Sequence, residues 1–171
     1  EDYEQFKIKK YGFHGTSHKY VSGCAIDYLK SKGLPWDKIV TCHLGNGSSI
    51  TAVKDGKSVD TSMGMTPLEG VPMGTRSGDI DASVVEMLCS WKGMTPQQVV
   101  TYLNKQSGFL GVSGVSSDSR NVLEAAEKGN YRAQLAMDMF TYRVKKYIGS
   151  YAAAMGGLDC IVMTGGIGEN S

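Results

Sequence analysis

Two short apolar runs, each followed at once by a glycine-rich turn, constrain the fold of this chain more than any other feature. The runs cover residues 39–44 and 159–164, and the turns begin at Gly45 and Gly165. Short apolar runs bounded by glycines are typical of buried strands. Because open α/β sheets bind ligands where their strands end, both turns are candidate binding loops.

Further strands and several helices are expected around these runs. Residues 49–53 and 57–60 flank Asp55-Gly56, a strong β-hairpin signal. Apolar residues at helical spacing, together with capping residues, predict five helices. These are a helix capped by Thr16 or Ser17 and ended by Gly33, one capped by Asp79, one beginning at Thr95-Pro96, one near 121–128, and one at 131–155. The order of elements is mixed α/β.

A long stretch without periodicity, residues 61–78, is rich in Gly, Met, Thr and Pro. Loops of this length inside compact domains are usually functional or disordered. The apolar content of this one argues against disorder. We therefore expect a functional loop here.

The composition excludes several classes of function. The net charge is +1, which favours neither nucleic acid as a partner nor an acidic tail. No apolar run approaches the roughly 18 residues needed to cross a bilayer, so no membrane partner is expected. Glycine is the outlier, with 22 among 171 residues against a usual share of about 7%.

The cysteines and the chain ends complete this picture. Cys24, Cys42, Cys89 and Cys160 lie far apart and beside apolar residues. They are interpreted as small buried side chains in a reducing cytoplasm, in preference to disulfides or a metal site. The chain begins without methionine and stops at Ser171, directly after a glycine turn that ought to open a helix. A fragment of a longer protein is therefore expected.

The two glycine turns each allow two interpretations. In His43-Leu44-Gly45-Asn46-Gly47 the glycines let the backbone approach a phosphate, but Asn-Gly is equally typical of a tight hairpin. No lysine follows, which disfavours a Walker-type site. The turn at residues 164–170 fits a nucleotide loop or a plain helix cap. Its glycine spacing does not match the dinucleotide-binding fingerprint.

Three other positions are candidates for chemistry. Arg76 lies between two glycine-containing segments and could bind phosphate or carboxylate through its guanidinium fork, although most arginines are simply on the surface. His14 precedes a predicted helix and is interpreted as a catalytic or hydrogen-bonded histidine. His18 is interpreted as structural. The H-x-x-x-H spacing could bind zinc, but only Cys24 is near enough to be considered as a third ligand, and it is a weak one.

The segment before the helix near 121–128 also has two interpretations. Asp118 or Ser119 could be a plain helix cap. Alternatively, this loop could contact a ribose or a base.

Read together, five segments resemble the signature segments of the acetate and propionate kinase family. They are YGFHGTSHKYV at 11–21, HLGNGSSI at 43–50, DTSMGMTPLEG at 60–70, MGTRSGDID at 73–81 and GGIGENS at 165–171. They occur in the family's order, so the resemblance covers nearly the whole chain. The chain departs from the family pattern at Lys9-Lys10, where an arginine pair is usual, at Val71-Pro72, and at Ala82, where proline is common.

The resemblance implies an α/β fold of the actin-like ATPase (ribonuclease H-like) type, shared by acetate and sugar kinases, heat-shock ATPases and actin. Residues 1–171 would be an incomplete half of a two-domain kinase, on its carboxy-terminal side, without the amino-terminal domain and the final carboxy-terminal segment. The implied activity is reversible phosphoryl transfer between ATP and acetate, which gives acetyl phosphate and ADP. Magnesium would accompany the nucleotide, and the enzyme would be a cytoplasmic homodimer.

The resemblance also implies residue roles. His14 would stabilise the transferring phosphoryl group, and Arg76 would hold carboxylate or phosphoryl oxygens. Phe13 and Pro67 would help to form an apolar pocket for the acetate methyl group. The nucleotide and its phosphates would contact His43, Gly45, Asn46, Gly47, Asp118, Ser119, Arg120, Gly165, Gly166, Ile167, Gly168 and Asn170. The residues that organise the metal would lie outside this chain, so none is expected within it.

Two alternatives remain at this point. One is a propionate kinase, because one methylene changes selectivity by only about 1–3 kcal/mol. The other is a nonenzymatic nucleotide-binding or dimerisation module. On either enzyme interpretation, the 171-residue chain alone is expected to have little or no kinase activity.

Overall fold

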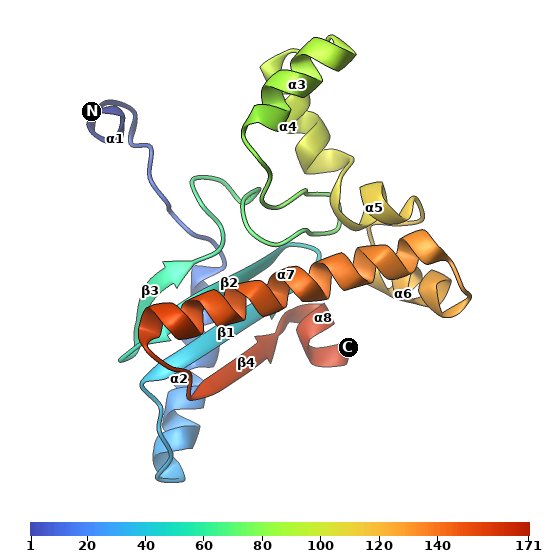
Figure 1. Ribbon diagram of the computed structural model, residues 1–171. Coiled ribbons are helices and arrows are strands. Elements are labelled where there is room, and N and C mark those ends of the chain that lie inside the picture. Colours follow the sequence, from blue (N-terminus) through green and yellow to red (C-terminus); the bar gives the residue numbers. More distant parts are fainter. The chain divides into compact units, whose positions relative to one another are not determined.

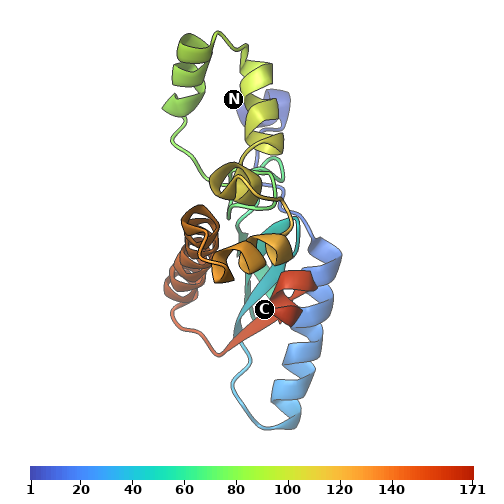
Figure 2. The same ribbon diagram turned by 90° about the vertical axis from the view of Figure 1, so that its right-hand side faces the viewer.

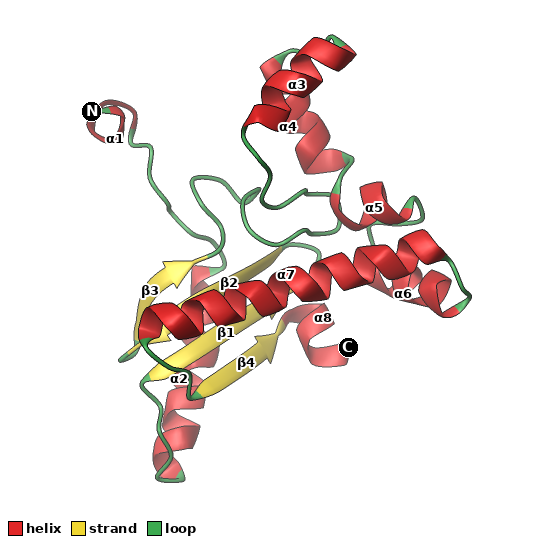
Figure 3. Ribbon diagram, in the orientation of Figure 1, coloured by secondary structure: helices red, strands yellow, loops and turns green.

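The computed structural model describes residues 1–171, which divide into two compact units. The first unit comprises residues 1–70 and 143–171, and the second comprises residues 71–142. The first contains the only sheet, and the second is built from helices and one long loop (Figures 1 and 3).

The sheet has four strands in the order β3-β2-β1-β4. They are β1 (Lys38–Leu44), β2 (Ser48–Lys54), β3 (Lys57–Thr61) and β4 (Cys160–Thr164). β1 pairs antiparallel with β2, and β2 pairs antiparallel with β3, whereas β4 runs parallel to β1. Because β1 and β4 run in the same direction, both predicted glycine turns leave the sheet at one edge.

The buried side chains of β1 and β2 explain why these strands occupy the centre of the sheet. Ile39, Val40, Ile50 and Ala52 are completely buried. Strands covered on both faces read as continuous apolar runs rather than alternating ones. The turn between β2 and β3 has positive φ at both central residues, as the Asp-Gly signal predicts for a tight hairpin.

Helices cover both faces of the sheet. α2 (Gly15–Ser31) lies on one face, where Leu29 packs in a cluster with Ile39 and Val53. The carboxy-terminal part of α7 (Tyr131–Met155) lies on the other face (Figure 2), and Lys54 donates a hydrogen bond to the carbonyl of Met155 there. The two remaining helices of this unit are short: α1 (Asp2–Phe6) and α8 (Gly165–Asn170).

The second unit contains α3 (Ser83–Lys92), α4 (Pro96–Lys105), α5 (Gly108–Ser113), α6 (Ser119–Glu127) and residues 131–142 of α7. α4 begins as predicted, with Thr95 as its N-cap. Thr95 and the side chain of Gln98 together form a capping box. Phe109 and Phe140 pack against each other within this unit, with tilted rings whose centroids are 5.1 Å apart. The long loop was also predicted correctly, since residues 62–82 contain no helix or strand.

Three predicted helix starts were wrong. α2 begins at Gly15 with His14 at its N-cap, so neither Thr16 nor Ser17 caps it. Asp79 does not cap α3; the carboxylate of Asp81 instead accepts a hydrogen bond from the backbone of Ser83. The third difference concerns the last glycine turn, which was expected to open a helix whose residues lie beyond Ser171. Its glycines form the short helix α8 themselves.

Two further differences concern residue types. Residues 108–113 form a short helix, α5, that is not among the five predicted helices, because its glycines are poor helix formers. Only Cys42 is buried as predicted, whereas Cys24 is exposed and Cys89 and Cys160 are half-buried. All four are free thiols. None of the helices combines the length and the apolar character that a membrane crossing requires.

Candidate functional site

Three histidines and a buried serine gather where α2 begins and β1 ends. His14 is the N-cap of α2, His18 lies within α2, and His43 lies on β1. Ser49 lies on β2 directly opposite His43 in the antiparallel register. The side chains of a directly opposed pair lie on one face of the sheet. The packing of α2 on this face therefore brings all four side chains together.

The backbone at His14 is unusual. Its φ of 58° is left-handed, one of only three such non-glycine residues in the chain. Histidine visits this region more readily than most residues, but such conformations concentrate at functional sites. The conformation places the His14 ring in a stack with the His43 ring, at a centroid distance of 4.1 Å and an interplanar angle of 20°.

Hydroxyl groups hold the histidine rings in place. Ser49 Oγ lies 2.8 Å from Nδ1 of His14 and 2.7 Å from Nε2 of His18. The other nitrogen of His18 lies 2.7 Å from Oγ1 of Thr41. Ser17 Oγ lies 2.9 Å from Nδ1 of His43. The prediction that His18 is structural is consistent with this burial and bonding, since only 5% of its surface is exposed.

The electrostatics of this cluster favour neutral rings. Burial, followed by the nearby His43 and His14, lowers the pKa of His18 to about 4. Burial also lowers the pKa of His43. A buried charge is costly, and a second charge within a few ångströms adds to that cost. His18 and His43 are therefore neutral at pH 7 and act through hydrogen bonds.

The two glycine turns lie side by side at the edge where β1 and β4 end. In the parallel register His43 is paired with Thr164, and Gly165 follows directly. Gly165 has φ of +80°, and a Cβ there would lie 2.7 Å from the carbonyl oxygen of Leu44. Only glycine, which has no Cβ, can occupy this position without a clash. The contact places the second glycine turn directly against Leu44, the residue before the first.

The first glycine turn joins two antiparallel strands, so the hairpin interpretation of its shape is confirmed. Gly45 donates to the carbonyl of Gly47 at 3.2 Å, and the Ser48 hydroxyl donates to the carbonyl of Gly45 at 2.9 Å. Asn46 is exposed at the tip. A Cβ on Gly45 would lie 3.9 Å from Nε2 of His43, so the turn borders the histidine cluster.

The second glycine turn is the helix α8, and some of its polar side chains are already satisfied. The Asn170 amide donates to the carbonyl of Gly166 at 2.9 Å, and the Thr164 hydroxyl donates to the Glu169 carboxylate at 3.3 Å. Ile167 and Gly168 are half-buried. A Cβ on Gly168 would lie 3.7 Å from the carbonyl of Cys42, so α8 is seated on the end of β1.

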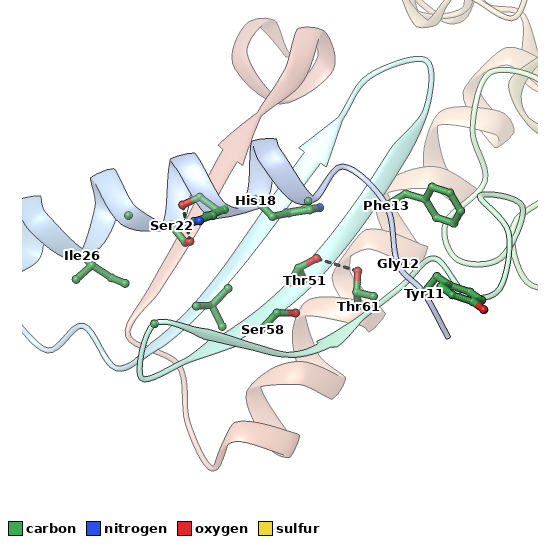
Figure 4. Close-up of a pocket in the computed structure, with 14 residues that line it drawn as sticks. Tyr11, Gly12, Phe13, His18, Ser22, Ile26, Thr51, Ser58 and Thr61 are labelled. Atoms are coloured by element: carbon green, nitrogen blue, oxygen red, sulfur yellow. Dashed lines mark hydrogen bonds between the residues drawn. The ribbon is translucent and has the colours of Figure 1, made fainter. Parts of the chain in front are cut away.

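A pocket of about 600 Å³ opens between α2 and the hairpin of β2 and β3 (Figure 4). Phe13 is one of its lining residues, together with His18, Ser22, Thr51 and Thr61. The hydroxyls of Thr51 and Thr61 are 2.8 Å apart in its wall. Pro67, the second residue predicted for an apolar substrate pocket, lies in the loop after β3 and does not line this one.

Arg76 belongs to the second unit, where helix contacts fix the loop that carries it. The carbonyl of Arg76 accepts from the backbone of Met73 at 3.0 Å, and the Ser77 amide donates to Leu103 at 2.9 Å. The Ser107 amide donates to Thr75 at 2.9 Å. The predicted functional loop is therefore ordered at Arg76, and the guanidinium contacts the sulfur of Met73 at 3.6 Å.

Asp118, Ser119 and Arg120 are also in the second unit, at the start of α6. Asp118 caps this helix by accepting from the backbone of Arg120, which confirms the helix-cap interpretation. The Arg120 side chain also bonds the same carboxylate, and these hydrogen bonds lower the pKa of Asp118 to about 2. Exposed pairs of this kind contribute little stability. A ribose or base contact by this segment remains a prediction.

Sequence reasoning missed the hydroxyl groups that organise the histidines, namely those of Ser17, Thr41 and Ser49. A signal was available. If Gly45–Gly47 is a hairpin turn, Ser49 must lie opposite His43, on the face that the predicted helix with His14 covers. Because the sequence of this turn allows two interpretations, it does not by itself define this register.

No group of three or more His, Cys, Asp or Glu side chains is arranged to hold a metal ion. The ring nitrogens of His18 are both bonded to hydroxyls. Glu169, the carboxylate nearest the glycine turns in the sequence, is bonded to Thr164. Both nitrogens of His18 and the carboxylate of Glu169 are therefore already engaged within the chain.

Comparisons with known proteins show the family of this chain. The family model described as the acetokinase family matches residues 1–171. The acetate kinase of Caldicellulosiruptor saccharolyticus is 62% identical over the whole chain, which covers 43% of that relative. The chain thus spans less than half the length of the curated relatives it matches.

Solved structures give the same result. The crystal structure of Porphyromonas gingivalis acetate kinase matches 98% of the chain with a TM-score of 0.92 and 52% identity. The crystal structure of a propionate kinase from Francisella tularensis matches 99% with a TM-score of 0.92 and 48% identity. The chain covers 42% and 43% of those two proteins. The predicted α/β fold class is confirmed.

Proposed function

This chain belongs to the acetokinase family, and we propose that it is the part of a kinase that transfers a phosphoryl group between ATP and acetate. One observation carries the proposal: the histidine cluster and both glycine turns meet at the edge where β1 and β4 end. This is the edge at which α/β sheets bind ligands. Histidine side chains and the backbone of the two glycine turns lie there, and we propose that they receive a ligand of high negative charge.

The proposed step is a direct displacement at the γ-phosphorus of ATP. A carboxylate oxygen of acetate forms the new P–O bond, and the bond to the oxygen that bridges the β- and γ-phosphorus breaks. ADP leaves with the electron pair of that bond. Such transfers depend on positioned donors and positive charge around a charge-spread transition state. His14 and Arg76 are proposed to supply a donor and a charged fork to the phosphoryl oxygens.

The nucleotide is proposed to lie along the two glycine turns. The backbone of Gly45, Asn46 and Gly47 is suited to its phosphates, because glycines allow close approach. The turn at residues 165–170 is proposed to contact the nucleotide beside them. Asp118, Ser119 and Arg120 are proposed for the adenosine. Magnesium would enter with the nucleotide, held by phosphate oxygens and by residues outside this chain.

The acceptor is proposed to be a short carboxylate, with Phe13 and Pro67 at its methyl group. Propionate is the second candidate, because the propionate kinase structure fits the chain as closely as the acetate kinase structure does. One methylene separates the two acceptors, which limits discrimination to about 1–3 kcal/mol. The rest of the protein would complete the pocket. A homodimer in the cytoplasm is proposed on the same family grounds.

Replacement of Arg76 in the full-length kinase tests this function against the nonenzymatic alternative. The Arg76→Ala variant is expected to form acetyl phosphate from ATP and acetate roughly 10²–10³-fold more slowly, as is usual when one transition-state donor is lost. Lys105→Ala, which removes an exposed cation at the end of α4, is the control and should retain normal turnover. Normal turnover of Arg76→Ala would favour a nucleotide-binding or dimerisation module.

A further inference from the structure

The hydrogen bonds around Ser49 form one continuous chain, from Thr41 on β1 through His18 and Ser49 to His14. Its three links measure 2.7, 2.7 and 2.8 Å. Thr41 and Ser49 are completely buried, and His18 nearly so. Solvent therefore cannot replace a missing donor in this series of hydrogen bonds. Each hydroxyl or ring proton must be donated to one of the neighbouring groups.

Counting protons shows which group donates and which accepts in each of these hydrogen bonds. A neutral imidazole has one N–H and one acceptor nitrogen, and a hydroxyl has one proton. His18 is neutral, because its pKa is lowered to about 4. If the Thr41 hydroxyl donates to His18, then His18 must donate to Ser49. The buried Ser49 hydroxyl has only the two histidine rings as partners, so its proton is satisfied only by Nδ1 of His14. In the opposite direction, Nδ1 of His14 carries the proton.

Geometry separates these two directions at Thr41. In the opposite direction, the Thr41 hydroxyl has to donate to the carbonyl of Thr51, 3.5 Å away. In the first direction, it donates to His18 across 2.7 Å. A distance of 3.5 Å lies outside the range of good O–H···O hydrogen bonds, whereas 2.7 Å is at its centre. The first direction is therefore the stronger arrangement.

We propose that Ser49 is a positioning residue which, by donating its hydroxyl proton to Nδ1 of His14, fixes the proton of that ring on Nε2. His14 can then donate a hydrogen bond to a phosphoryl oxygen as a neutral ring. This inference rests on the proposed function. It assigns to Ser49 and His18 the control of which nitrogen of His14 acts as the donor.

The ring stack strengthens this role. His14 is held on one side by Ser49 and on its face by His43, which Ser17 holds in turn. A ring fixed at one nitrogen and along its face has little freedom to rotate. Nε2 therefore keeps a constant direction, which is the requirement for a donor in a transition state of defined geometry.

The chain has only three histidines, so nitrogen NMR of protein labelled with ¹⁵N-histidine can test the proposal directly. Each signal can be assigned by replacing one histidine at a time. At pH 8 we expect the His14 proton on Nε2 and an unprotonated, hydrogen-bonded Nδ1. A His14 proton on Nδ1 would overturn the proposal, whether or not any variant folds.

The matched variants are Ser49→Ala and Ser48→Ala. Ser48 is equally buried and lies on the same strand, but its hydroxyl bonds to Gly45 rather than to a histidine. We expect the Nδ1 signal of His14 to move towards that of an unbonded imidazole in Ser49→Ala and to stay in place in Ser48→Ala. An unchanged signal in Ser49→Ala would contradict the proposal.

Turnover of the full-length kinase separates this proposal from the proposed function. Ser49→Ala is expected to lower kcat by up to about 100-fold through misplacement of the donor, with little change in KM for ATP. His14→Ala is expected to lose at least as much. If His14→Ala retained activity, the proposed role of His14 itself would fail. If only Ser49→Ala retained full activity, the positioning role alone would be wrong.

Discussion

At the scale of single residues, Gly165 is a position where the backbone tolerates little change. Its positive φ and the 2.7 Å approach to Leu44 together forbid a side chain. We expect Gly165→Ala to reduce the free energy of unfolding by about 2 kcal/mol or more. Urea denaturation measures this difference.

The neighbouring glycine supplies the control. A Cβ on Gly166 would meet nothing within 4 Å. Because alanine is a better helix former than glycine, Gly166→Ala should be neutral or stabilising by up to about 1 kcal/mol. Equal losses in the two variants would contradict the proposed packing of α8 on β1.

The lowered pKa of His18 predicts how the free energy of unfolding depends on pH. The lowered pKa of about 4 in the folded state compares with an ordinary value near 6.5. Between these values the unfolded chain binds more protons, so the free energy of unfolding falls as the pH falls. The loss attributable to His18 should reach roughly 3 kcal/mol at pH 4.

Urea denaturation at pH 7 and at pH 4.5 measures this loss. His18→Gln should be less stable at pH 7 but should show a shallower dependence on pH in this window. If wild-type stability were independent of pH between 7 and 4.5, the conclusion that His18 is buried and neutral would be refuted. Stability that rose on acidification would refute it as well.

Which residues carry the site could be predicted only in part from the sequence. His14, Asn46 and Arg76 stood out because motifs of known chemistry surround them. Ser49 and Thr41 did not, since a serine or threonine in an apolar strand has no signature of its own. Their importance arises from strand register and helix packing, which place a hydroxyl against a ring nitrogen.

At the scale of elements, α4 offers the clearest test of local sequence control. The Thr95 hydroxyl accepts a hydrogen bond from the backbone N–H of Gln98, and the side-chain oxygen of Gln98 accepts one from the backbone N–H of Thr95. Thr95→Ala should cost about 1 kcal/mol of stability. Thr101→Ala, on the exposed side of the same helix, should change stability by less than about 0.5 kcal/mol. Similar losses, measured by thermal or urea unfolding, would contradict the capping role.

Elements with strong local signals were predicted well, and those defined by tertiary contact were not. The bounds of α7 and the hairpin of β2 and β3 follow from periodicity and from Asp55-Gly56. The start of α2 does not, because His14 adopts a left-handed conformation supported by its contacts with Ser49 and His43. Likewise, α5 is rich in glycine and depends on backbone hydrogen bonds to Met73 and Gly74.

At the scale of the whole molecule, the sequence predicted the class of sheet but not the strand order. The parallel pairing of β1 with β4 joins segments more than a hundred residues apart. Local patterns carry no information about such a pairing, whereas the resemblance of five motifs does. That pairing brings the two glycine turns to one edge, so the candidate site is a property of the whole sheet.

The chain is proposed to supply donors and phosphate-binding turns to the site, with the metal held by residues outside it. It also spans only 43% of its curated relative's length. For these reasons we expect the remaining parts of the kinase to be required for turnover, even where the chain retains nucleotide binding.

Formation of acetyl phosphate from ATP and acetate, measured side by side for the full-length kinase and for the 171-residue chain, tests the central claim most directly. We expect the full-length kinase to turn over and the chain alone to be slower by at least about 10²-fold, as when transition-state donors are removed. A full-length protein that forms no acetyl phosphate, or a chain that matches its turnover, would contradict the account.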